Sequence, residues 1–278
     1  MGLEINIKKT KIVTFCPMNN KPLLEKFFIG DTEIKHTEKY CYLGIMFHQN
    51  GSFTTANAEL RAKALRGLHG MKHNIVKDSL SFRAINTLFD ALVKPILLYG
   101  CQVLAPHSPT VKYLAAVSDD TQPSRYLQYL ANDHYEKFHM KFLKWNLSVH
   151  SKASNSGCWG ESGRYPLIFE ACKLAIDYFE RAEALSLCSD DTLLAAAFNE
   201  QKSLGLDWYS NTFRLISSVK KSDPQQSSRP CRTSITISQI MRNSFVDNWR
   251  QDINSSPKLQ FYSQLKSEFS PEPYLDHI

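Results

Sequence analysis

The chain has 278 residues, of which 43% are hydrophobic, 12% aromatic and 22% charged. This composition excludes a disordered or collagen-like chain, and the length predicts one large or two modest domains. The net charge of +6 is unevenly placed, because residues 1–77 carry 12 Lys/Arg and 6 Asp/Glu whereas residues 78–278 carry 21 of each. Positive charge confined to one region is typical of a surface that binds a polyanion.

The sequence predicts a protein without a membrane span, since no window approaches 18 uninterrupted apolar residues. Lys8, Lys9 and Lys11 interrupt the segment where the apolar part of a secretory signal would lie. The seven cysteines are scattered and form no Cys-x-x-Cys pair. We therefore expect reduced thiols in an intracellular protein, nuclear or cytoplasmic and not secreted.

The first fifty residues have the pattern of strands and turns. Within residues 5–15, Ile5 and Ile7 alternate with polar neighbours and Ile12, Val13 and Phe15 continue the pattern, which predicts a strand. Residues 27–34, with Gly30-Asp31 at their centre, predict a hairpin. Residues 40–47 predict one further strand, which ends at Asn50-Gly51.

From residue 53 the apolar period becomes helical. Residues 53–76 place an apolar stripe within about 80° of arc, and a second helix follows with Ser79 or Ser81 as its cap and Pro95 as its end or kink. The stripe consists of Leu60, Ala64, Leu68, Met71 and Ile75, and the inward residues of the second helix are Phe82, Ile85, Leu88, Phe89 and Leu92.

Residues 107–123 form a connection that contains Pro, Ser and Asp, and they are the best candidate for a boundary. Beyond them we expect helices, interrupted by a Ser- and Gly-rich loop at 148–163 and an exposed polar linker at 220–233. The predicted helices cover residues 126–145, 166–185, 191–204, 208–219 and 235–253. The fold class is therefore α+β, with a small antiparallel sheet before two helical regions.

Three segments carry motifs. They are Gly2-Leu3-Glu4-Ile5-Asn6 with Lys9-Thr10-Lys11, then Ile29-Gly30 to Ile34 with Tyr40-Cys41-Tyr42-Leu43-Gly44, and finally Ala91 to Cys101 with Leu98-Tyr99-Gly100. In this order and spacing they resemble the strand after the catalytic turn, the primer-grip hairpin and the end of the thumb in reverse transcriptases of non-LTR (LINE-type) retrotransposons. Arg164-Tyr165-Pro166-Leu167 and Glu272-Pro273-Tyr274-Leu275 resemble the region that follows the polymerase in such elements.

The resemblance implies a division of the chain into four parts. Residues 1–52 would be a palm remnant with the primer-grip-like hairpin, and residues 53–106 would be thumb-like helices. Residues 107–124 would be a linker, and residues 125–278 a helical C-terminal region.

The family's polymerase holds two Mg²⁺ ions with an early acidic residue and with an aromatic-x-Asp-Asp turn. Both elements would lie upstream of Met1. The sequence does contain Asp119-Asp120 and Asp190-Asp191, but each pair follows a Ser, so we interpret them as solvated caps or turns. We therefore expect no metal site and no cofactor in this chain, which would be a catalytically incomplete remnant of an RNA-directed DNA polymerase.

The resemblance also implies a template–primer surface of RNA or DNA on residues 1–77, with phosphate contacts that weaken as salt rises. Lys9 matches a family lysine near the incoming triphosphate and is the one catalytic candidate, although without metals we interpret it as a solvated strand-end lysine. The candidate binding residues are Lys8, Lys9, Lys11, Lys39, Tyr42, Gly44, Arg61, Lys63, Arg66 and Lys72. An ordinary charged helix face is the alternative interpretation of the basic residues.

Two other functions stay open. The chain could be the C-terminal part of an active reverse transcriptase whose upstream exon supplies the carboxylates, or residues 125–278 could be a helical protein-interaction module. The strand predicted at 5–15, left with an open edge, is a candidate protein contact.

Two further patterns have ordinary interpretations. His69 and His73 have a metal-binding spacing but no third ligand, so we interpret them as surface imidazoles. The aromatic residues at helical spacing are interpreted as core rather than as a stacking platform for bases. They are Tyr135, Phe138, Phe142 and Trp145.

Overall fold

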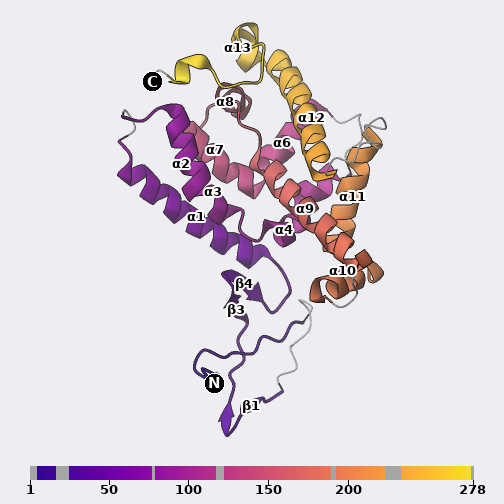
Figure 1. Ribbon diagram of the computed structural model, residues 1–278. Coiled ribbons are helices and arrows are strands. Elements are labelled where there is room, and N and C mark those ends of the chain that lie inside the picture. The colour runs from indigo at the N-terminus through magenta and orange to yellow at the C-terminus, as the bar shows by residue number, and fades with distance from the viewer. Residues whose placement is uncertain are drawn as a thin grey trace. The chain divides into compact units, whose positions relative to one another are not determined.

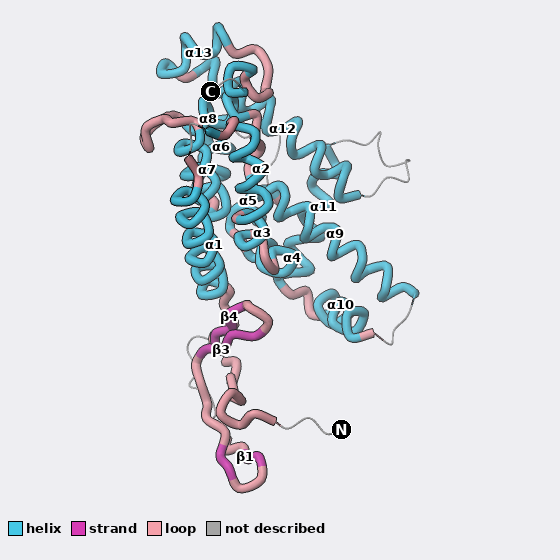
Figure 2. The backbone as a smooth tube through the Cα atoms, turned by 60° about the vertical axis from the view of Figure 1, so that its left-hand side comes forward, coloured by secondary structure: helices cyan, strands magenta, loops and turns pink. Residues whose placement is uncertain are grey.

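The computed structural model describes residues 5–16, 25–76, 79–116, 122–188, 192–222 and 233–276. The chain divides into two compact units, Met1–Arg66 and Gly67–Ile278. Among the described residues all strands belong to the first unit, and the second unit is helical (Figure 1; Figure 2). The predicted α+β class with a mostly helical C-terminal region is confirmed. The division falls inside helix α1 (Thr54–Asn74), whereas the sequence places boundaries at residues 52, 106 and 124.

Two short antiparallel hairpins form the sheets of the first unit. β1 (Phe28–Ile29) pairs with β2 (Thr32–Glu33) around Gly30, whose φ is 59°, so the predicted hairpin at 27–34 is confirmed. β3 (Lys39–Tyr42) pairs with β4 (Ile45–His48), so the prediction of one continuous strand over 40–47 is wrong. The chain reverses at Leu43 and Gly44, which have φ of 47° and 84°. Two successive residues of positive φ suit a tight two-residue turn.

The strand predicted at residues 5–15 is also wrong. The main-chain oxygen of Asn6 accepts from the N–H groups of Lys9 and Thr10, each at 3.0 Å, and its Oδ1 accepts from the N–H of Lys9 at 3.2 Å. An asparagine that takes backbone donors in this way favours a turn over a ladder. Within residues 5–16 only Ile12 forms a bridge, with His36, and there is no strand edge of the kind expected.

The second unit contains the end of α1 and a succession of mostly short helices (Figure 1). In chain order they are α2 (Phe82–Leu92), α3 (Lys94–Leu97), α4 (Cys101–Leu104), η2 (Ala105–His107), α5 (Pro109–Leu114), α6 (Pro123–Asn132), α7 (His134–Asn146), α8 (Asn155–Ser162), α9 (Leu167–Cys188), α10 (Leu193–Ser203), α11 (Asp207–Ser222), α12 (Thr233–Ser255), η4 (Pro257–Leu259), α13 (Gln260–Leu265) and η5 (Pro273–Asp276).

Helix α9 is the centre of this unit, since α4, α7, α10, α11 and α12 all pack against it. Its buried Phe169 contacts Phe245 of α12 edge to face, with ring centroids 5.8 Å apart. Two hydrogen bonds join residues of this unit that lie far apart in the sequence. Trp208 Nε1 donates to the main-chain oxygen of Gln102 at 3.0 Å, and Asn211 Nδ2 donates to that of Pro106 at 2.9 Å.

Most of the predicted helices are confirmed. In α1 the stripe residues Leu60, Ala64, Leu68 and Met71 are buried. Ser81 caps α2, because its Oγ accepts from the N–H of Ala84 at 3.2 Å. The helices α9, α10, α11 and α12 lie where the apolar period predicts them.

Four details differ from the sequence-based expectation. Leu92 is 55% exposed rather than inward, because α2 ends there. The helix predicted over 126–145 is broken at Asp133, whose Oδ1 accepts from the N–H of Tyr135 at 2.8 Å and so caps α7.

The predicted loop at 148–163 contains α8, because burial of Cys158 and Trp159 outweighs the low helix propensity of Ser and Gly. Residues 107–116 include α5, in which Val111 is buried.

Some predictions fall outside the described residues. These include Asp119-Asp120, Asp190-Asp191 and residues 223–232 of the predicted linker. Among the described helices, no single one is long and apolar enough to cross a bilayer. One pair, Phe82–Leu97 with Cys101–His107, has the necessary length and composition together but bends by 58°.

We expect opposite effects from adding a methyl group at two helical glycines. A Cβ on Gly160 would lie 2.6 Å from Trp249 Cζ2 and 2.5 Å from the Tyr262 hydroxyl, so Gly160→Ala lowers the free energy of unfolding by about 2 kcal/mol. A Cβ on Gly70 meets nothing within 4 Å, so Gly70→Ala raises it by up to about 1 kcal/mol. Urea unfolding followed by circular dichroism measures both. A stabilising Gly160→Ala would contradict the close approach of α8 to α12.

Candidate nucleic-acid interface

The N-terminal lysines lie on and just after the Asn6 turn. Lys8, Lys9 and Lys11 are exposed, and among the described residues none of their ammonium groups is in an ion pair. The turn is tied to β3, because the Tyr40 hydroxyl donates to the main-chain oxygen of Lys9 at 3.3 Å. The structure therefore presents these three candidates to solvent as cations.

The β3–β4 turn brings three further candidates together. Lys63, on α1, donates from Nζ to the main-chain oxygen of Gly44 at 3.1 Å. The adjacent Tyr42 is 60% exposed. An ammonium group and an open aromatic ring thus lie at the same turn, and these are groups that bind a phosphate and stack on a base.

Helix α1 carries the remaining candidates on its polar side. Arg61 and Arg66 are exposed, and among the described residues neither forms an ion pair. Lys72 instead contacts an aromatic side chain, with Nζ 4.7 Å from the centroid of the Trp145 ring. The structure therefore leaves Arg61 and Arg66 accessible and holds Lys72 against α7.

The histidine pair and the aromatic set lie in different surroundings. His69 and His73 are exposed, and the described residues contain no group of three His, Cys, Asp or Glu that could hold a metal ion. The prediction of a core face on α7 is confirmed for the three residues that are buried there, while Trp145 is half-buried. The three are Tyr135, Phe138 and Phe142.

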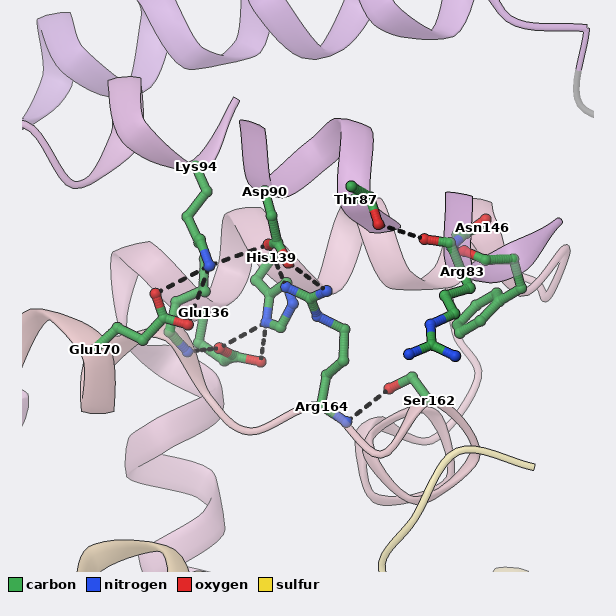
Figure 3. Close-up of polar contacts among 12 residues, drawn as sticks. Arg83, Thr87, Asp90, Lys94, Glu136, His139, Asn146, Ser162, Arg164 and Glu170 are labelled. Carbon is green, nitrogen blue, oxygen red and sulfur yellow. Dashed lines mark hydrogen bonds and ion pairs between the residues drawn. The ribbon is translucent and has the colours of Figure 1, made fainter. Parts of the chain in front are cut away.

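A charged cluster that no local sequence pattern predicts in full lies between α2, α3, α9 and the segment before α9, and we call it the Asp90 cluster (Figure 3). Its members are Asp90, Lys94, Arg164 and Glu170. Arg164 donates to both carboxylate oxygens of Asp90, at 3.1 Å and 2.5 Å. Lys94 Nζ lies 3.2 Å from Asp90 Oδ1 and 3.1 Å from Glu170 Oε2. Two cations and two anions neutralise each other, so this cluster offers no unsatisfied charge to a ligand.

The pKa of Asp90 reflects its two basic partners. Burial acts to raise the pKa of this carboxyl, but the hydrogen bonds and charges of Arg164 and Lys94 outweigh burial, so the pKa lies below its usual range. Asp90 is therefore ionised in the folded state over the whole neutral and mildly acidic range.

A second missed feature is the fully buried carboxylate of Glu136, on α7 (Figure 3). Oε1 accepts from Trp159 Nε1 at 2.6 Å, and Oε2 accepts from the main-chain N–H of Leu167 at 2.9 Å. His139 Nδ1 lies 3.3 Å from both oxygens. Groups from α7, α8 and α9 thus surround this buried carboxyl group and compensate the cost of removing it from water.

The sequence holds part of the signal for these features. Asp90 and Lys94 are four residues apart on a helix, which predicts a local pair. Arg164 and Leu167 belong to the Arg-Tyr-Pro-Leu segment that the sequence analysis singled out. Their acidic partners are 74 and 31 residues away, and nothing local identifies them.

No protein-family model, curated protein or solved structure matches this chain.

The Asp90 cluster predicts a stability loss that depends on pH. We expect Asp90→Asn to lower the free energy of unfolding by about 2 kcal/mol at pH 7. The substitution removes the negative charge that pairs with both Arg164 and Lys94 in a partly exposed site. Since the folded-state pKa is lowered, the wild-type contribution is complete above the ordinary value of 3.8 and is lost as pH falls below it.

Urea unfolding of wild type and Asp90→Asn at several pH values measures this difference. Asp247→Asn is the matched control, because Asp247 is exposed and forms no ion pair among the described residues. The gap between wild type and Asp90→Asn should narrow in acid. A gap that is constant from pH 7 to the acid limit of folding would show that Asp90 is not held by charge.

Proposed function

We propose that this chain is the thumb-side part of a reverse transcriptase of the non-LTR retrotransposon type, and that it binds template–primer without itself adding nucleotides. The observation that carries the proposal is the accessible positive charge of Met1–Arg66. This unit has ten Lys/Arg and six Asp/Glu. Its lysines and arginines at positions 8, 9, 11, 39, 61 and 66 are exposed and lack ion-pair partners among the described residues.

Phosphate binding is the chemistry that such side chains suit. Each phosphate contact releases a condensed counterion, which gives affinity without sequence preference and with a steep dependence on salt. A lysine or arginine that is already in an ion pair must break that pair first. Within the part of the chain that the structure describes, the exposed residues named above have no such pair to break, so they can contact phosphates directly.

The β3–β4 turn adds contacts of another kind. Lys63 fixes this turn through Gly44, and Tyr42 lies beside it with most of its ring open to solvent. We assign the turn to the sugar or base of the terminal primer nucleotide, as its resemblance to a primer grip implies. The charged residues would then supply affinity, and the turn would supply position.

We also propose that nucleotide addition needs carboxylates that the motifs of this chain do not supply. The sequence contains no aromatic-x-Asp-Asp turn, and its two Asp pairs each follow a Ser. We further propose an intracellular location, in keeping with the unpaired thiols of the described cysteines.

The charge of α1 gives a direct test of binding. We expect Arg61→Gln with Arg66→Gln to weaken binding of an RNA–DNA duplex about tenfold and to reduce the slope of log affinity against log salt by about 1.8. Fluorescence anisotropy with a labelled 16-base-pair duplex measures both quantities. Lys202→Gln with Lys258→Gln is the control, because it removes the same charge from exposed positions on α10 and η4.

Two results would contradict the proposed interface. One is a wild-type affinity that does not change with salt, since phosphate contacts require such a change. The other is an equal loss of affinity in the control variant, because net charge alone would then explain binding.

Primer extension tests the second half of the proposal. We expect no nucleotide incorporation when the purified chain is incubated with a primed RNA template, deoxynucleotides and Mg²⁺, because two-metal catalysis needs clustered carboxylates. Gel analysis of the labelled primer gives the readout. Extension by the wild type that is lost in Lys9→Gln would contradict this expectation.

A further inference from the structure

Helix α7 carries a stripe of lysines that the stability of the helix does not explain. Lys137, Lys141 and Lys144 are spaced four and three residues apart, so they lie within about 60° on one face. Like charges at these spacings destabilise a helix. The one acidic residue of α7, Glu136, is fully buried and satisfied elsewhere. Among the described residues Lys137 and Lys141 are exposed and form no ion pair.

The stripe borders a groove of about 470 Å³ between α7 and the segment that leads into α8. This volume is within the range of sites that bind small ligands or parts of larger ones. The groove is lined by the three lysines, and also by Met140, Trp145 and Asn155. Lys144 connects α7 to the segment on the other side of the groove, because its Nζ donates to the main-chain oxygen of Ser151 at 2.8 Å.

Trp145 gives the groove an aromatic surface. Its ring is half-buried, and Lys72 lies against it with Nζ 4.7 Å from the centroid. An indole among ammonium groups suits a ligand with both aromatic rings and negative charges. From Lys137 to Lys141 the helix rises about 6 Å, so both ammonium groups can lie along one nucleic-acid strand.

We propose that this groove binds single-stranded nucleic acid, with phosphates on Lys137 and Lys141 and a base against Trp145. Single-strand sites elsewhere combine a basic track with aromatic stacking in this manner. An acidic peptide would supply the negative charge but no aromatic ring to stack on the indole, which Lys72 already contacts. All residues of the site belong to Gly67–Ile278, so it does not depend on the template–primer interface proposed for Met1–Arg66.

The test uses the full chain and a fluorescein-labelled strand of twelve thymidines, with binding followed by anisotropy. We expect Lys137→Gln with Lys141→Gln to weaken binding about tenfold and to reduce the salt slope by about 1.4, the value for two contacts to a single strand. Lys202→Gln with Lys258→Gln should change affinity less than about twofold. Thermal unfolding of each variant shows whether the fold is kept, and Lys144 is left unchanged because of its contact with Ser151.

Variants of Trp145 test the proposed stacking of a base on the indole ring. Trp145→Phe keeps an aromatic face and should retain most of the affinity, whereas Trp145→Leu should lose about tenfold. Equal affinity of the two variants for the thymidine strand would overturn the contact between base and ring.

Three other outcomes would overturn the proposal. The first is an equal effect of the two double-lysine variants on the thymidine strand. The second is competition by a twelve-residue polyglutamate as effective as that by unlabelled thymidine strand, which would indicate a general anion site. The third is equal weakening of single-strand and duplex binding by Lys137→Gln with Lys141→Gln. Because Arg61→Gln with Arg66→Gln is measured in parallel on the duplex, failure of this site is distinguishable from failure of the template–primer interface.

Discussion

The helical unit depends on a buried carboxylate. Glu136 has no contact with solvent, and a buried polar side chain is destabilising unless hydrogen-bond partners surround it. The partners come from α7, α8 and the first residue of α9. Because the N–H of Leu167 would otherwise be an orphan of the α9 N-terminus, one interaction satisfies both the acid and the start of the central helix.

The segment between α8 and α9 is consequently held from two sides. Arg164 points to Asp90 of α2, while Leu167, three residues later, donates to Glu136 of α7 (Figure 3). Ser162 also accepts from the N–H of Arg164 at 3.4 Å. A stretch that would otherwise be an exposed connection therefore fixes α2, α7 and α9 with respect to one another.

Local patterns in the sequence predicted most of the helices, since a period of 3.6 residues needs no knowledge of distant partners. The errors occur where one polar side chain or one turn decides the outcome. Asn6 replaces a strand with a turn, Leu43-Gly44 replaces one strand with two, and Asp133 divides a helix. The α8 helix lies in a Ser- and Gly-rich stretch, and the burial of Cys158 and Trp159 explains it.

The candidate sites were predictable to different degrees. Exposed lysines and arginines near the N-terminus follow from regional charge, and the structure leaves most of them accessible. The lysines of α7 were overlooked because residues 78–278 have no net charge, which conceals a one-sided arrangement on a single helix. The Asp90 cluster and the Glu136 contacts join residues far apart in sequence, so only the folded chain shows them.

The hydrogen bonds of Trp208 and Asn211 have a kinetic consequence. They join residues 106 and 105 positions apart, and others connect α8 with α12 across 93 positions. Helical proteins usually assemble quickly because their contacts are local, whereas distant contacts require large loops to close first. Folding of this unit should therefore be slow for a helical protein, and the last helices must be synthesised before its centre can be completed.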